Sequence, residues 1–170
     1  GGGGYVFPQY IEKNWPGSRN DVAEIDPGIT KAATEAFGLK KDTTINTITL
    51  DARNYVDQLL QAKRNGREIP SYDFIYEDAF SDYSVPCQLV TKEFNDKIFK
   101  ILTDDGIYMI NSIDTYESCR FLGSYIHTLE QTFPHVYTVT EPGPASIRRI
   151  FVLIASKKKI DPENLIRQHR

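Results

Sequence analysis

The chain has 170 residues, a length that suits one domain with a substantial core. Hydrophobic residues make up 40% of it and charged residues 25%, which is typical of a globular protein. The formal net charge of -3 argues against a nucleic-acid-binding surface. Cys87 and Cys119 stand far apart without CxxC spacing, so we expect two reduced thiols and neither a disulfide nor a thiolate metal site. Within these residues we also expect no membrane helix and no signal peptide.

Short apolar runs alternate with helical patterns along the first part of the chain. The expected elements are a helix at 5–15, a strand at 21–25, a helix at 27–37, a strand at 45–50 and a helix at 53–64. Pro16-Gly17 ends the first helix, Pro27 suits the first turn of the second, and Gly38 stops it. This alternation predicts βαβ units and a parallel sheet.

The second part of the chain continues the alternation and ends differently. The expected elements are a strand at 72–76, a loop at 79–90, a helix capped by Thr91, a strand at 107–113 and a helix at 115–133. Asp104-Asp105-Gly106 is expected to turn the chain into that last strand. Segments 134–140 and 150–156 predict a final antiparallel hairpin. We therefore expect one Rossmann-like α/β domain at 1–156, followed by a charged tail at 157–170 that forms a peripheral helix.

The chain begins with Gly1, Gly2, Gly3 and Gly4, and an acidic strand end with Glu24 and Asp26 follows about twenty residues later. Glycines let the backbone approach a nucleotide-type cofactor closely, and a carboxylate at that distance accepts hydrogen bonds from ribose hydroxyls. In such sheets a buried strand precedes the glycines. We therefore expect a first strand from an upstream segment, or a sheet completed by another segment or subunit.

Carboxylates recur where the predicted strands end. Glu24 and Asp26 follow one strand, Asp51 follows the next, and Asp78 with Asp82 follows a third. Ligands of open α/β sheets bind at this edge, which favours a ligand site. The alternative for Asp51 is a helix N-cap, because strand-to-helix junctions favour aspartate for that purpose.

Taken in order, these motifs resemble the spermidine synthase (polyamine aminopropyltransferase) family, within the class I S-adenosylmethionine-dependent methyltransferase fold. The resemblance covers residues 1 to about 156 and rests on the following segments: Gly1-Gly2-Gly3-Gly4, Glu24-Ile25-Asp26, Asp51-Ala52-Arg53, Tyr72-Asp73-Phe74-Ile75-Tyr76-Glu77-Asp78-Ala79-Phe80 and Asp104-Asp105-Gly106. The stretch from Asp78 to Phe94, with Thr91-Lys92-Glu93-Phe94 at its end, resembles the loop over the polyamine site.

The resemblance implies a role for each matching residue on the cofactor side. Gly1 to Gly4 would line the methionine moiety, and Glu24, with Asp26 beside it, would hold the ribose. Asp51 would accept from the adenine amino group, with the Ala52 backbone nearby. The implied cosubstrate is S-adenosylmethionine or its decarboxylated form, without a metal.

On the acceptor side, the resemblance implies that Asp78 orients and deprotonates the attacking amine. Asp82 would bind the other charged end of the substrate, and Glu77 would add negative field. Tyr76 and Tyr83 would supply walls and hydroxyls, with simple packing as the alternative. Ser81 and Ser84 lack a nearby histidine and are expected to be loop hydroxyls.

Three features depart from the family pattern. The family's glycine motif carries an aspartate that meets the amine of the decarboxylated cofactor, whereas here the glycines run into Tyr5. The spacing from Asp78 to Asp82 is one residue longer than in the family. The family's N-terminal strand domain, which closes the amine pocket, is not found in these residues.

These observations predict an aminopropyltransferase-like enzyme acting by direct displacement on a small amine acceptor. The alternatives are a methyltransferase of unknown acceptor, a non-catalytic domain that kept the fold, and a dinucleotide-dependent hydride enzyme. The spacing of His127, His135 and His169 suggests no metal pair. The charge runs Arg148-Arg149 and Lys157-Lys158-Lys159 are expected on a solvated edge, with an acidic partner or membrane surface as the alternative. We expect a cytoplasmic protein, with homodimerisation and fusion to upstream or membrane-anchoring segments left open.

Overall fold

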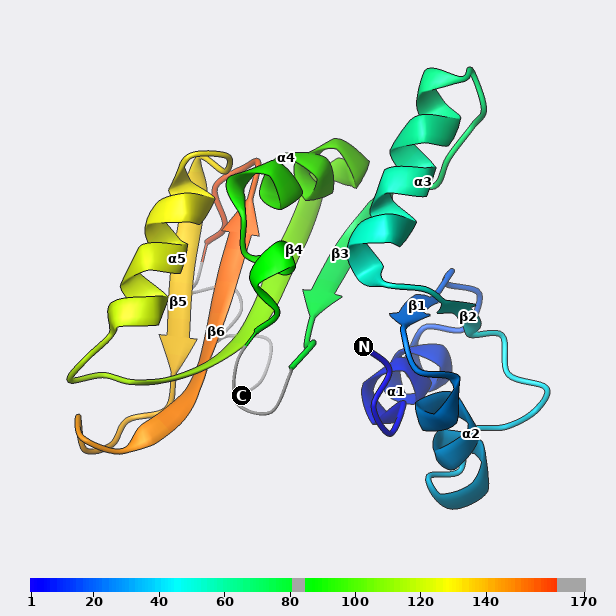
Figure 1. Ribbon diagram of the computed structural model, residues 1–170, viewed down its shortest axis with the longest axis horizontal. Coiled ribbons are helices and arrows are strands. Elements are labelled where there is room, and N and C mark those ends of the chain that lie inside the picture. The colour runs from blue at the N-terminus through cyan, green and yellow to red at the C-terminus, as the bar shows by residue number, and fades with distance from the viewer. Residues whose placement is uncertain (81–84, 162–170) are drawn as a thin grey trace. The chain divides into compact units, whose positions relative to one another are not determined.

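The computed structural model describes residues 1–80 and 85–161, which fall into two compact units (Figure 1). The first unit comprises Gly1–Arg67 and the second begins at Glu68. Each is described by itself. In the described residues, no helix combines the length and apolar character needed to cross a lipid bilayer.

The first unit contains a two-stranded parallel sheet and three helices. Its elements are α1 (Val6–Asn14), β1 (Asp21–Glu24), α2 (Pro27–Ala36), β2 (Asn46–Thr49) and α3 (Ala52–Arg64). β1 and β2 pair with Val22 beside Thr47. The buried cluster consists of Tyr5, Val22, Ala33, Leu39 and Ile45. It therefore gathers around β1 and α2, and the residue that directly follows the glycines belongs to it.

The second unit contains a four-stranded mixed sheet in the order β3-β4-β6-β5. Its elements are β3 (Tyr72–Glu77), the 3₁₀ helix η1 (Cys87–Leu89), α4 (Lys92–Ile101), β4 (Leu102–Thr115), α5 (Arg120–Glu130), β5 (His135–Thr140) and β6 (Arg148–Ser156). β3 and β4 run parallel, whereas β6 pairs antiparallel with both β4 and β5. Figure 1 shows α4 and α5 on the same face of this sheet. Buried side chains between them and the sheet include Tyr108, Leu129, Phe133 and Leu153.

Most predicted elements are confirmed with boundaries shifted by one or two residues, including the final antiparallel hairpin of β5 and β6. Two predictions were wrong. Asp104-Asp105-Gly106 does not turn the chain ahead of a strand, because β4 already begins at Leu102 and these residues form an irregularity within it. The long helix begins at Arg120 rather than residue 115, because β4 continues to Thr115, where it still pairs with Arg148. The predicted tail helix lies mostly outside the described residues.

Candidate functional site

The four glycines form a tight turn that an added side chain would disturb. The Tyr5 amide donates to the Gly2 carbonyl over 2.8 Å, and Gly3 has a φ of +49°. A Cβ on Gly2 would lie 2.2 Å from the Tyr5 ring. Glycine is therefore required at position 2 by close approach and favoured at position 3 by backbone conformation.

Glu24 connects this turn to the end of β1. Glu24 is only 6% exposed. One carboxylate oxygen accepts from the Gly2 amide (2.7 Å) and the other from the Asp26 amide (2.9 Å). The structure thus brings together three of the residues predicted on the cofactor side. Each carboxylate oxygen has a second lone pair, so these two bonds leave acceptor capacity for a ligand hydroxyl.

Asp26 and Asp51 both serve as helix N-caps. Asp26 Oδ1 accepts from the Gly28 amide at 2.7 Å, at the start of α2. Asp51 Oδ1 accepts from the Asn54 amide at 3.1 Å, and Ala52 is the first residue of α3. The capping interpretation that the sequence left open for Asp51 is therefore correct. Any contact of these residues with a cofactor stays a prediction.

Tyr5 has a structural role that the sequence did not indicate. It is fully buried, adopts a left-handed backbone conformation with a φ of 56°, and its hydroxyl lies 3.0 Å from Thr30 Oγ1. Its side chain therefore fills the core of the first unit. The Tyr5 hydroxyl is paired with Thr30 of α2. Tyr5 therefore does not offer the cofactor a polar group in place of the carboxylate that the family carries after its glycines.

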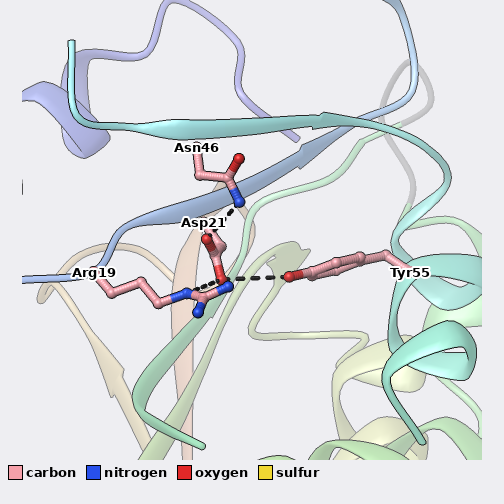
Figure 2. Close-up of polar contacts among 4 residues, drawn as sticks. All are labelled: Arg19, Asp21, Asn46 and Tyr55. Atoms are coloured by element: carbon pink, nitrogen blue, oxygen red, sulfur yellow. Dashed lines mark hydrogen bonds and ion pairs between the residues drawn. The ribbon is translucent and has the colours of Figure 1, made fainter. Parts of the chain in front are cut away.

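A second cluster missed by sequence reasoning surrounds Asp21, at the opposite end of β1 (Figure 2). Its side chain is only 2% exposed and accepts from Arg19 Nε (2.8 Å), Asn46 Nδ2 (2.8 Å) and the Tyr55 hydroxyl (3.3 Å). These contacts join β1, β2 and α3. The cluster lies away from the strand ends where ligands of such sheets bind, and we interpret it as structural.

In the second unit, Asp78 directly follows β3 and is exposed to solvent. Its Oδ1 accepts from Asn111 Nδ2 at 2.8 Å. The sequence gave no signal for Asn111, because its partner is 33 residues away. Tyr76 is 42% exposed and stacks on Phe74 with a centroid distance of 6.2 Å. Partial burial raises the pKa of the Tyr76 hydroxyl. The predicted substrate residues Asp82 and Tyr83 lie outside the described residues.

Glu77 does not add negative field to the predicted site in the expected way. Its side chain is buried on the face covered by α5, where it accepts a hydrogen bond from the Tyr108 hydroxyl. That hydroxyl lies 3.5 Å from the hydroxyl of Tyr125 on α5. Burial raises the pKa of Glu77 to about 7, although the bond from Tyr108 opposes the shift. The buried Glu77 carboxyl therefore keeps its proton to a higher pH than an exposed glutamate does.

Across residues 1–80 and 85–161, no three His, Cys, Asp or Glu side chains cluster in a way that could hold a metal ion. An open depression near the carboxyl end of β4 is lined by Thr115, Glu117, Ser118 and Arg120, none of which was predicted as a site residue. The strand ends are the better candidate for a ligand site, since the walls of this depression are exposed or half-buried polar side chains.

Comparison with known proteins identifies two groups of relatives. The chain is 29% identical over 155 residues to a polyamine aminopropyltransferase of Vibrio vulnificus, covering 91% of this chain and 48% of that protein. It is 28% identical over 172 residues to the human eEF1A lysine and N-terminal methyltransferase, covering 96% of this chain and 24% of that protein. The chain thus spans half or less of the length of these relatives. No family model matches it.

Among solved structures, human methyltransferase-like protein 13 in complex with SAH superposes with a TM-score of 0.80 at 26% identity. The alignment covers 98% of this chain and 75% of that one. The predicted resemblance and the predicted fold are confirmed at this level. The chain has the Rossmann-like fold of class I S-adenosylmethionine-dependent methyltransferases, which aminopropyltransferases share, and its named relatives are transferases.

Proposed function

We propose that this chain is the cofactor-binding and catalytic part of a transferase that moves a carbon group from S-adenosylmethionine, or its decarboxylated form, to an amine nitrogen. The observation that carries the proposal is Asp78, an exposed carboxylate directly after β3 with one oxygen held by Asn111. It lies at the strand ends where ligands of α/β sheets bind. The names of both relatives refer to amines, one to a polyamine and the other to a lysine and an N-terminus.

The first unit supplies the features that suit the cofactor. The side-chain-free turn at Gly2 and Gly3 allows close backbone approach, and buried Glu24 retains lone pairs for ribose hydroxyls. Asp51 and the Ala52 backbone are proposed for the adenine ring. When bound, the cofactor supplies an electrophilic carbon beside a sulfonium.

The chain's own contribution to the reaction is the alignment and deprotonation of the acceptor. An amine attacks carbon only as the neutral base, so an ammonium must first lose a proton. Asp78 attracts the cationic amine, accepts one of its protons and holds the nitrogen in line with the carbon–sulfur bond of the cofactor. The carbon–nitrogen bond would form as that bond breaks, and its electron pair would stay on the sulfur of a neutral thioether leaving group. Because the same steps serve a methyl group and an aminopropyl group, Asp78 alone does not select between them.

Tyr5 favours methyl transfer within this class. The spermidine synthase family carries a carboxylate after its glycines, where it meets the amine of the decarboxylated cofactor. Here Tyr5 is turned into the core and bonded to Thr30. A site without that carboxylate should not repel the carboxylate of S-adenosylmethionine. Aminopropyl transfer is the second candidate, supported by the similarity to the Vibrio vulnificus enzyme along 91% of this chain.

Calorimetric titration with S-adenosylmethionine, its decarboxylated form and methylthioadenosine tests the cofactor assignment. We expect binding of at least one sulfonium nucleoside. A preference for S-adenosylmethionine supports methyl transfer, and a preference for the decarboxylated form supports aminopropyl transfer. No binding of any of the three would contradict the proposed function and favour a non-catalytic domain.

Replacing Asp78 by asparagine tests the acceptor side. The amide cannot accept the proton, so we expect Asp78→Asn to lower kcat by about 10²- to 10⁴-fold, the usual contribution of a general base. Cofactor affinity should not change. Asp73→Asn is the matched control, because Asp73 is an exposed residue of β3 whose carboxylate also bonds a neighbour, Thr103 at 3.1 Å. Wild-type turnover in Asp78→Asn would remove Asp78 from the mechanism.

A further inference from the structure

Asp78 directly follows β3, and Asn111 lies beside it on the neighbouring strand β4. The parallel register pairs Tyr76 with Met109 and Glu77 with Ile110. Asp78 and Asn111 are the next residues along the two segments. Since side chains alternate between the faces of a sheet, both leave it on the face opposite to Glu77. The 2.8 Å bond from Asn111 Nδ2 to Asp78 Oδ1 joins them there.

The chemistry of the two groups fixes the orientation of the Asn111 amide. A carboxylate only accepts hydrogen bonds, so Asn111 must turn its Nδ2 toward Asp78 and its Oδ1 away. In this orientation Oδ1 is buried and has no partner within residues 1–80 and 85–161. An unpaired buried acceptor lowers stability. The Asn111 amide therefore donates to Asp78 through Nδ2, whereas its Oδ1 accepts no hydrogen bond from the described residues.

The neighbours of Asn111 on this face give no packing reason for an asparagine. Val152 of β6 lies opposite Asn111 in the register, and Met109 and Ile113 flank it along β4 on the same face. An aliphatic side chain at position 111 would suit these neighbours and leave no unpaired oxygen. The hydrogen bond to Asp78 is thus the feature of the surroundings that calls for an amide.

We propose that Asn111 is a positioning residue that holds one oxygen of Asp78 so that the other oxygen is presented to the acceptor nitrogen. This inference rests on the proposed function, in which Asp78 accepts the proton of the amine. Asp78 is exposed, and among the described residues its Oδ2 makes no hydrogen bond, so no described donor competes with the acceptor nitrogen for this oxygen. Asn111 acts through Asp78 and does not itself receive the proton.

A double-mutant cycle of Asn111→Ala and Asp78→Asn tests the proposal. Turnover is measured with putrescine and with a lysine-containing peptide as acceptors, and cofactor affinity is measured by calorimetry. We expect Asn111→Ala to lower kcat about 10- to 100-fold, the effect of a misplaced catalytic group, with cofactor affinity within about twofold of wild type. In the Asp78→Asn background it should have no further effect, because coupled residues do not act additively. Losses that simply multiply would overturn the proposal.

Two further variants separate positioning from a merely structural role. Asn111→Leu removes the unpaired oxygen, so it should keep or raise the melting temperature while it loses turnover as Asn111→Ala does. Ser112→Ala is the matched control, since Ser112 follows on β4, faces the other side and is fully buried, and its hydroxyl has no partner among the described residues. It should leave kcat unchanged. An equal loss of kcat in Ser112→Ala would assign the effect to β4 as a whole and overturn the proposal.

Failure of the proposed function and failure of this inference give different results. Wild-type turnover in Asp78→Asn contradicts the role that the proposed function gives to Asp78, whereas lost turnover in Asp78→Asn with wild-type turnover in Asn111→Ala contradicts only the positioning role of Asn111. If neither acceptor is turned over, putrescine binding in the presence of methylthioadenosine replaces kcat in the cycle. Asn111→Ala should then weaken putrescine binding about tenfold. Unchanged binding would overturn the proposal.

Discussion

Glu77 links the folding of the second unit to pH. Its carboxyl is 8% exposed, accepts from Tyr108, and leaves Oε1 without a partner among the residues that the structure describes. Burial raises its pKa from 4.5 to about 7. A carboxyl that binds its proton more tightly in the folded state contributes stability that is fully present below the unfolded pKa. That contribution is lost as the pH rises through the folded pKa.

We therefore expect Glu77→Gln to remove a pH dependence of folding. At about 1.4 kcal/mol per pH unit, the interval from 4.5 to about 7 corresponds to about 3 kcal/mol. Glutamine stays neutral and can still accept from Tyr108. The variant should match wild type near pH 4.5 and exceed it by up to about 3 kcal/mol above pH 7.

Urea unfolding of both proteins across this pH range measures the difference. Glu68→Gln replaces an exposed glutamate and serves as the control, with an expected difference that does not vary with pH. A constant difference between Glu77→Gln and wild type would contradict the buried assignment of Glu77. The sequence could not predict this burial, because Tyr108 and Tyr125 are supplied by β4 and α5, far along the chain.

At the scale of elements, the sequence predicts a helix boundary well where a residue at that boundary sets it. Asp26 and Thr91 cap α2 and α4 as such residues commonly do, and Gly38 follows α2 with a φ of +74°. Local signals failed for β4. Its extension to Thr115 depends on pairing with β6, which comes more than thirty residues later and overrides the helical pattern after residue 115.

The irregularity in β4 predicts a strict requirement for glycine at position 106. A Cβ there would lie 3.0 Å from the carbonyl oxygens of Thr103 and Tyr72 and 2.9 Å from Leu102 Cδ2. Backbone oxygens cannot easily move aside, so Gly106→Ala should lower the free energy of unfolding by about 1–3 kcal/mol, as overpacking does. Chemical denaturation measures this.

Gly123→Ala is the matched control for Gly106→Ala. Gly123 lies in α5, where an added Cβ would meet no atom within 4 Å. Alanine is the better helix former, so this variant should gain up to about 1 kcal/mol. Equal effects of the two substitutions would show that the crowding around Gly106 does not limit stability.

At the scale of the whole molecule, the residues proposed for the cofactor and those proposed for the acceptor fall in different compact units. The sequence indicated Glu24 and Asp78 because the structure confirms the strands that they end or follow, and it indicated the glycines by their distance from Glu24. Their roles toward cofactor and acceptor stay predictions. Asp26 and Asp51 accept from amides two and three residues away, which is the capping role that local sequence already suggests. The sequence could not predict the contacts of Asp21, because Asn46 and Tyr55 lie 25 and 34 residues away and only the folded chain brings them close.

This division predicts that cofactor binding and turnover can be lost separately. A cofactor that binds only the folded state stabilises it by about 2.7 kcal/mol at a hundredfold excess over its Kd, so S-adenosylmethionine should raise the melting temperature of wild type. Asp78→Asn should show the same rise, since its change lies in the second unit. Glu24→Ala should show none, because it removes the carboxylate that holds the Gly2 and Asp26 amides. Glu35→Ala, an exposed glutamate of α2, controls for the loss of charge and should keep the rise. A rise retained in Glu24→Ala, or lost in Asp78→Asn, would contradict the assignment of the two roles to the two units.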